Sequence, residues 1–149
     1  MTILAGYDPG LSTGFCLSYY DAITPLRHIS HTIIKGGLQG VIDHWYANDL
    51  GSEVDEVVAE SFRLDGRTPN PCTVPLEIQG ALTVLCGESI PFTLQANTFK
   101  AHVPDEKLKE LGMWWRGAGH DRDAGRHALA YLKTRGHYPT LMWAFPPKL

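Results

Sequence analysis

The first third of the chain consists of short apolar runs separated by turn residues. Residues 2–7 are apolar almost throughout, residues 13–20 follow a Pro-Gly and Ser-Thr-Gly turn, and residues 27–34 alternate loosely before two glycines. An apolar run without polar interruption is typical of a central strand that is buried on both faces. The pattern therefore predicts three successive strands, the first of which is buried in the middle of a sheet.

Helical spacing of apolar residues appears later in the chain. Over residues 38–46, apolar side chains recur at i, i+3, i+4, i+7 and i+8, which predicts a helix with one apolar face. Residues 73–86 fit a second helix with Pro75 in its first turn. Residues 121–135 fit a final helix, with acids in the first turn, bases in the last and Gly136 as its C-cap.

Two further strands and two short helical segments complete the pattern. The β-rich runs at 54–62 and 90–95 predict the fourth and fifth strands. Pro104 and Gly112 bound a short helix, and a helical turn is expected over residues 97–103. The order is therefore βββαβαβα with one minor helix, which predicts an α/β fold.

Length and composition are those of an ordinary globular domain. The 149 residues are 44% apolar and 19% charged, which predicts a single domain over residues 1–149 with a core of its own. No window approaches the roughly 20 apolar residues that span a bilayer, and the chain begins without a basic leader. We therefore expect no membrane partner and a cytoplasmic location. The three scattered cysteines predict reduced thiols.

Charge is unevenly distributed along the chain. The net charge of −3 argues mildly against a partner as negative as nucleic acid. Residues 1–99, however, hold 4 Lys and Arg against 11 Asp and Glu, whereas residues 100–149 hold 9 against 5. This asymmetry hints at a local basic face, and a site for divalent cations would account for part of the acidic excess.

Acidic residues stand at three element ends that can meet in space. Asp8 closes the first strand, Glu60 closes the fourth, and His120, Asp121 and Asp123 open the last helix. If the two strands are parallel neighbours, both carboxylates emerge at the same edge of the sheet, where ligands bind in α/β folds. His120 and Asp123 are three residues apart and share a helix face, whereas Asp121 is directed elsewhere unless the helix begins later.

Each of these residues also has a structural explanation. Asp8 can be a turn residue that bonds to its own backbone, Glu60 an ion-paired surface acid, His120 an N-cap, and the two aspartates charges that complement the helix dipole. A carboxylate cluster, in contrast, is stabilised by divalent cations between its members. Oxygen ligands with one imidazole suit Mg²⁺ or Mn²⁺. Pro9 and Gly10 favour a sharp turn that holds Asp8 at the strand end.

Four motifs resemble a known family. In order and spacing, G-Y-D-P-G-L-S-T-G-F, V-V-A-E-S-F, I-Q-G-A-L and H-D-R-D-A-G-R-H-A-L-A resemble the RuvC-type Holliday junction resolvases of the RNase H-like superfamily, especially its compact phage-borne members. The resemblance runs over nearly the whole chain. It implies an RNase H-like α/β fold in which helices flank a five-stranded mixed sheet of order 3-2-1-4-5.

The resemblance also implies a site and a substrate. Asp8, Glu60, His120 and Asp123 would form the catalytic set of metal ligands, with Asp121 as the alternative to His120. Two Mg²⁺ or Mn²⁺ ions per active site would then serve the hydrolysis of phosphodiesters. The substrate would be branched DNA, above all four-way junctions, and not a small molecule.

Three further assignments follow from the same resemblance. Lys100 lies near the place where the family has a basic residue beside the scissile phosphate, which makes it a candidate for catalysis and DNA binding. Residues 76–82 match the helix that carries the subunit interface, which implies a homodimer with one active site in each subunit. Phe62 is nearest to the aromatic that stacks on an unpaired base, although its spacing is one residue short. The acidic net charge and the Pro-rich segment 62–72 depart from the family pattern.

Basic and aromatic residues near these elements are further candidates for DNA binding. The arginines concerned are Arg63, Arg67, Arg116 and Arg122. They would meet phosphates, and the alternative is a solvated surface. Trp114 and Trp115 suggest stacking on bases or packing on the core, and Arg126 can pair with Asp123.

Most histidines are interpreted as structural. The four in this class are His28, His31, His44 and His127. No pair of Cys and His residues has the spacing of a structural zinc site, so we expect no zinc.

The favoured interpretation is a metal-dependent endonuclease that cuts branched DNA, as a Holliday junction resolvase does. A non-catalytic junction-binding module and a RuvC-like nuclease acting on flaps, forks or RNA are the alternatives. The D-P-G-L-S-T-G turn also resembles the phosphate-binding turn of actin-like and sugar-kinase-like ATPases, but 149 residues leave no room for their two lobes. Phage recombination or genome packaging is the process that the resemblance suggests.

Overall fold

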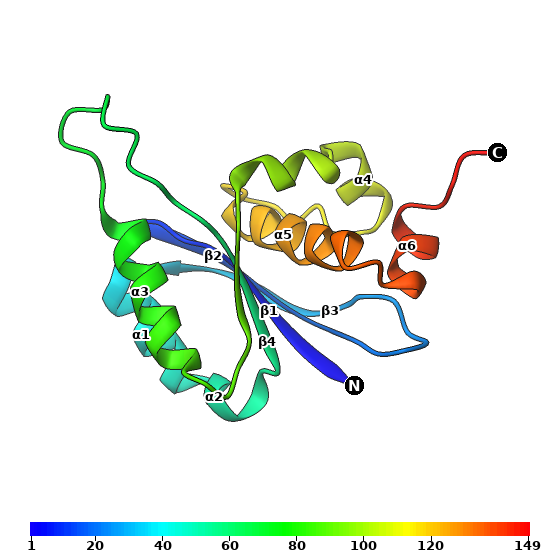
Figure 1. Ribbon diagram of the computed structural model, residues 1–149, viewed down its shortest axis with the longest axis horizontal. Coiled ribbons are helices and arrows are strands. Elements are labelled where there is room, and N and C mark those ends of the chain that lie inside the picture. The colour runs from blue at the N-terminus through cyan, green and yellow to red at the C-terminus, as the bar shows by residue number, and fades with distance from the viewer.

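A single mixed sheet of five strands organises the chain. The computed structural model describes all 149 residues, and its strands lie in the order β3-β2-β1-β4-β5 (Figure 1). The strands are β1 (Thr2–Asp8), β2 (Ser12–Tyr20), β3 (Arg27–Lys35), β4 (Glu56–Glu60) and β5 (Phe92–Gln95). The pairs β1–β2 and β2–β3 are antiparallel, whereas β1–β4 and β4–β5 are parallel. The predicted sheet order is confirmed.

Seven helical segments connect and cover the strands. They are α1 (Gly37–Ala47), α2 (Leu50–Glu53), α3 (Val74–Cys86), the 3₁₀ helix η1 (Asn97–His102), α4 (Asp105–Glu110), α5 (His120–Thr134) and α6 (Tyr138–Ala144). The longer predicted helices correspond to α1, α3 and α5, and the minor segments to η1 and α4. None of these helices is both long and apolar enough to cross a membrane.

Some element predictions are wrong in detail. The strand predicted over 54–62 is shorter as β4, and α5 begins at His120, one residue earlier than predicted. The helix over 121–135 is not the last, because α6 follows it. Neither α2 nor α6 was predicted, since 4 and 7 residues are too few to display a helical period.

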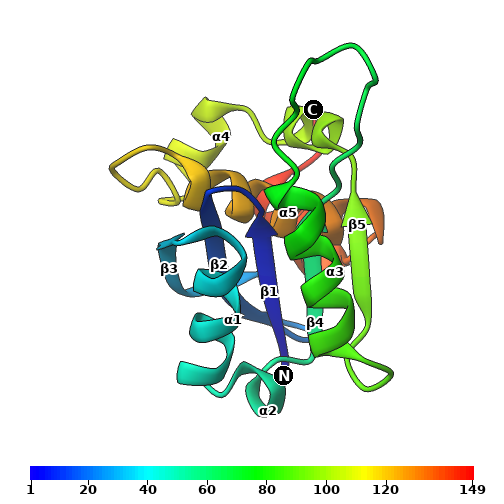
Figure 2. The same ribbon diagram turned by 90° about the vertical axis from the view of Figure 1, so that its left-hand side faces the viewer.

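Helices cover both faces of the sheet. α1 and α3 lie on one face, and α5 lies on the other together with α4 and α6 (Figures 1 and 2). β1 contributes side chains to the apolar cores on both faces of the sheet, because alternate side chains of a strand point to opposite faces. Ala5 and Tyr7 belong to the core under α1 and α3, and Leu4 belongs to the core under α5. The nearly continuous apolar run of β1 follows from this burial on two sides.

α5 packs directly against the backbone of β1 and β2. A Cβ atom on Gly14 would lie 1.7 Å from the carbonyl oxygen of His120, and one on Gly6 would lie 2.6 Å from the carbonyl oxygen of Ala124. Both neighbouring atoms belong to the backbone of α5, so a change of side-chain rotamer cannot relieve either clash. Glycine at these two positions therefore lets the first turn of α5 lie beside the end of β1, where Gly14 pairs with Asp8.

The close approach of α5 predicts that Gly6→Ala destabilises the protein. We expect the free energy of unfolding to fall by about 1–3 kcal/mol, the usual cost of overpacking, and to fall further in Gly14→Ala. Gly80→Ala in α3 is the matched control, because a Cβ there meets nothing within 4 Å and Ala is the better helix former. Urea denaturation followed by circular dichroism measures all three. A Gly6→Ala protein as stable as the wild type would contradict the packing argument.

Candidate active site

Two strand ends present carboxylates at the same edge of the sheet. Asp8 is the last residue of β1 and Glu60 the last of β4, and these strands are parallel neighbours. The turn after β1 is closed by Thr13, whose hydroxyl accepts a hydrogen bond from the N–H of Gly10 at 3.2 Å and lies 3.1 Å from its carbonyl oxygen. Thr13, and not Asp8, thus makes the side-chain hydrogen bonds of this turn. The carboxylate of Asp8 instead faces His120, with Oδ2 3.5 Å from Nδ1.

The first turn of α5 and Lys100 complete the group. The ammonium of Lys100, in η1, lies 2.9 Å from Oε1 of Glu60 and 3.7 Å from Oδ2 of Asp123. His120 and Asp123 both face the strand ends, as their spacing predicted. A cleft of about 500 Å³ is lined by Asp8, Lys100, His120 and Asp123. The structure therefore brings four predicted ligands and the predicted lysine to one place.

Asp121 lies outside this group. Its side chain is buried, and Oδ1 accepts a hydrogen bond from the N–H of Arg122 at 2.9 Å. Oδ2 lies 4.0 Å from Nε2 of His31, on the β3 side of the helix. Asp121 thus points away from the helix face that carries His120 and Asp123, as its spacing predicted.

The two strand-end carboxyls are shifted in opposite directions. Burial, followed by the charges of Glu60 and Asp123, raises the pKa of Asp8 to about 8. Burial also acts to raise the pKa of Glu60, but hydrogen bonds from His127 and Lys100 and the charge of Lys100 outweigh it and lower that pKa to about 2. Neighbouring acids whose environments separate their pKa values in this way are a feature of catalytic sites.

His127 was missed as a member of the site. The imidazole is fully buried, with Nε2 3.2 Å from Oε1 of Glu60 and Nδ1 3.0 Å from the side-chain nitrogen of Gln95. The sequence carried a signal for this contact, because His127 follows Asp123 by four residues and His120 by seven and so shares their helix face. The structural interpretation of His127 overlooked that spacing.

The donors in this group fit a hard divalent cation. Three carboxylates and an imidazole are ligands that Mg²⁺ and Mn²⁺ accept. Burial and then the negative charges of Glu60 and Asp123 raise the pKa of Asp8, and the ammonium of Lys100 shows that a cation is accommodated between Glu60 and Asp123. No three His, Cys, Asp or Glu side chains are yet spaced to hold one ion together. Binding would therefore require these side chains to close around it.

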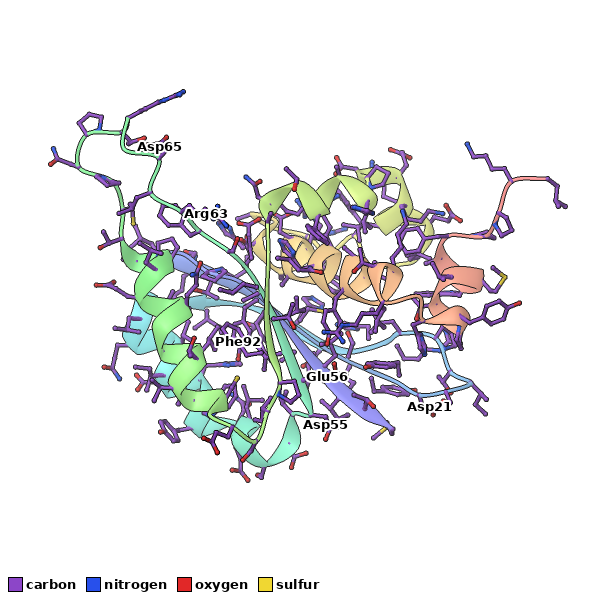
Figure 3. All side chains as sticks on the ribbon, in the orientation of Figure 1. Asp21, Asp55, Glu56, Arg63, Asp65 and Phe92 are labelled. Atoms are coloured by element: carbon purple, nitrogen blue, oxygen red, sulfur yellow. The ribbon has the colours of Figure 1, made fainter.

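The loop after β4 carries three candidate DNA contacts. Phe62 and Arg63 line a hollow of about 480 Å³ together with Glu60, and the backbone N–H of Phe62 donates to the side-chain oxygen of Gln79 in α3. Arg67 is exposed further along the loop. Figure 2 shows this loop extending from the edge toward which β1 points, and in Figure 3 Arg63 lies nearer the base of the loop and Asp65 farther out along it. Phe62 and Arg63 therefore lie beside Glu60, and Arg67 lies farther along the same loop.

The segment before α5 holds the other candidates. Arg116 is exposed, whereas the guanidinium of Arg122 donates to the carbonyl of Trp115 and lies 4.1 Å from the ring of Trp114. Arg122 is therefore engaged within the protein. Trp115 stacks on His31 with ring centroids 4.0 Å apart, so it packs on β3, and the neighbouring Trp114 remains 37% exposed.

The sheet order and the flanking helices define the RNase H-like fold of RuvC-type resolvases, and solved structures share it. The fold is similar to that of Thermus thermophilus RuvC in complex with a Holliday junction substrate, with a TM-score of 0.68, 17% identity, and 91% of this chain and 98% of that chain covered. The fowlpox virus Holliday junction resolvase has a TM-score of 0.59 and 13% identity, with 89% of this chain and 99% of that chain covered. The yeast mitochondrial Holliday junction resolvase has a TM-score of 0.54 and 14% identity, with 97% of this chain and 84% of that chain covered. No protein-family model and no curated sequence matches the chain. The fold that the resemblance implied is confirmed.

The electrostatics of the group predict that Asp8→Asn stabilises the metal-free protein. Burial and the negative charges of Glu60 and Asp123 oppose the ionised form of Asp8, which the unfolded chain adopts freely at neutral pH, and a neutral amide avoids this cost of folding. We expect the free energy of unfolding to rise by about 1 kcal/mol, which raises Tm by roughly 2–4 °C for a chain of this size. Asp43→Asn, which removes an exposed acid from α1, controls for the change in net charge. Thermal unfolding in EDTA at neutral pH is the measurement. A lower Tm for Asp8→Asn than for the wild type would contradict this electrostatic argument.

Proposed function

We propose that the protein is a metal-dependent endonuclease that cuts branched DNA, with four-way junctions as its principal substrate. The observation that carries this proposal is the convergence of Asp8, Glu60 and Asp123 from three elements, with His120, at one edge of an RNase H-like sheet. Such a cluster has no use in packing, because its charges repel one another. The fold supports the proposal, since the solved proteins that share it are Holliday junction resolvases.

The proposed chemistry assigns a role to each member of the group. Asp8, Glu60, His120 and Asp123 would hold two Mg²⁺ or Mn²⁺ ions. Such ions, when bound, activate a water and stabilise the leaving oxygen of a phosphodiester. Asp8 is anchored by a rigid turn, and α5 fixes the position of His120 and Asp123. Lys100 lines the same cleft and can contact a phosphate once its ammonium is no longer needed between the carboxylates.

Branched DNA would bind across the edge of the sheet that carries the cleft. Thermus RuvC and the fowlpox virus resolvase have both been seen in complex with Holliday junction DNA. In this chain Phe62, Arg63 and Arg67 belong to the loop next to Glu60, and Arg116 is exposed in the segment before α5. Phosphate contacts by these arginines would position the backbone, and Phe62 and Trp114 would supply stacking surfaces.

A second copy of the chain is the proposed partner of the α1–α3 face. Between these helices lies an apolar groove of about 390 Å³ whose lining includes Leu38, Ile42, Tyr46 and Val84. Val84 is 81% exposed and Tyr46 70% exposed, which is uncommon for large apolar side chains clustered on one face. The groove is continuous with the segment 76–82 that the sequence resemblance assigns to a subunit interface. A two-fold dimer would place one active site in each subunit.

Cleavage assays test the enzymatic proposal directly. Synthetic four-way, three-way, flap and linear duplex DNA are incubated in parallel with the protein and Mg²⁺, and products are resolved on denaturing gels. Wild type should cut the four-way junction fastest. Asp8→Asn should bind the junction with unchanged affinity but lose cleavage, because the backbone contacts to DNA remain while a metal ligand is lost. An Asp8→Asn protein that cuts at a rate near wild type would contradict the proposal. Faster cutting of flaps than of four-way junctions by the wild type would make flaps the principal substrate.

The proposed dimer predicts that Val84→Glu produces a monomer. A carboxylate in the apolar groove would be desolvated without a partner on association, so the dissociation constant should rise at least about tenfold, which corresponds to 1.4 kcal/mol. Thr83→Glu is the matched control, because Thr83 is exposed on the same helix and does not line the groove. Analytical ultracentrifugation measures the association. Equal dimerisation of both variants would place the interface elsewhere.

A further inference from the structure

A buried chain of polar side chains leads from β5 to Glu60. Gln95, the last residue of β5, is 4% exposed and His127 is fully buried. The side-chain nitrogen of Gln95 lies 3.0 Å from the carbonyl oxygen of His127 and 3.0 Å from its Nδ1. Nε2 of the same imidazole lies 3.2 Å from Oε1 of Glu60. Three elements, β4, β5 and α5, are joined by these contacts.

The backbone carbonyl of His127 determines which end of the Gln95 amide faces the ring. A carbonyl oxygen only accepts hydrogen bonds, so the group 3.0 Å from it must be the NH₂ of Gln95. An amide oxygen in that place would set two acceptors against each other in a buried site. The same NH₂ group therefore donates its second hydrogen to Nδ1 of His127.

This orientation fixes the tautomer of His127. A ring nitrogen that accepts a hydrogen bond carries no proton, so the proton of the imidazole is on Nε2. Nε2–H then donates to Oε1 of Glu60, the oxygen that the ammonium of Lys100 also contacts at 2.9 Å. Two donors thus hold the same oxygen of the carboxylate, and Oε2 takes part in neither of these contacts.

We propose that Gln95 and His127 are positioning residues that orient Glu60 as an anionic ligand for the divalent cation. The inference rests on the proposed function and adds two residues to it that do not touch the cation or the DNA. Outer hydrogen bonds of this kind orient metal-ligating side chains, and their loss usually lowers metal affinity about 10–100-fold. A purely structural role for His127 would instead require only a side chain that fills its buried volume.

The tautomer is tested without any metal. Selective ¹⁵N labelling of histidine and long-range ¹H–¹⁵N spectra distinguish a protonated ring nitrogen from one with a lone pair, and His127→Gln identifies the signal of His127. We expect protonation at Nε2 in the wild type and loss of that fixed state in Gln95→Leu. A wild-type signal with the proton on Nδ1 overturns the inference.

Cation binding is tested by the dependence of Tm on Mg²⁺ concentration. His127→Leu removes the donor to Glu60 and should raise the concentration for half-maximal stabilisation about tenfold or more. His127→Gln keeps an N–H donor at a comparable reach and should recover most of that loss. Leu129→Ala is the control, because it opens the core under α5 and touches none of the acids; it should lower Tm and leave the Mg²⁺ dependence unchanged.

The outcomes separate this inference from the proposed function. Junction cleavage by the wild type with the same Mg²⁺ dependence in all variants would overturn the positioning role and leave the nuclease standing. His127→Gln no better than His127→Leu would also overturn it. A wild type that binds Mg²⁺ but cuts no DNA would overturn the nuclease, and the variants would still decide the role of His127. A wild type without any Mg²⁺ response overturns both.

Discussion

The contact between α5 and the backbone of β1 and β2 is the constraint on which the rest of the molecule depends. Gly6 and Gly14 allow carbonyl groups of α5 to lie against the strands without an intervening side chain. The helix therefore begins beside the end of β1, and its first turn adds His120 and Asp123 to the carboxylates of two strands. A displacement of one turn, about 5.4 Å, would separate the acids from one another. The geometry of the site is thus set by packing that involves none of its own side chains.

The site itself opposes the stability that this packing provides. Asp8 is buried close to two other acids, and burial together with their negative charges raises its pKa. Positive groups offset part of it: Lys100 lies between Glu60 and Asp123, and Arg126 links Asp123 to Asp105 at 3.2 and 2.6 Å. Two apolar cores, one on each side of the sheet, hold the elements in place. Such local conflicts are found where function, not folding, selects the residues.

Sequence patterns predicted what depends on local order and missed what depends on distant contacts. β1 was recognised because burial on both faces leaves an apolar run, and the convergence of Asp8 and Glu60 followed from placing them at the ends of neighbouring strands. The 3.6-residue period placed His120 and Asp123 on one face of α5. α6 was not predicted, because 7 residues with a proline near the start are too few to show the helical period of apolar residues. The contact of His127 with Glu60 was missed although its spacing from His120 and Asp123 indicated it, whereas its contact with Gln95, 32 residues away on another element, has no signal in the sequence.

The loop after Glu60 links the candidate site to the proposed dimer face. The backbone N–H of Phe62 donates to the side chain of Gln79, so the chain leaving β4 is tied to α3 two residues after the ligand. α3 also lines the groove with Val84 exposed. One helix therefore contacts the loop after Glu60 at one point and lines the proposed dimer groove at another. In the proposed two-fold dimer, α3 would therefore connect the interface to the loop beside each candidate site, and the packing of this helix would set the distance between the two sites.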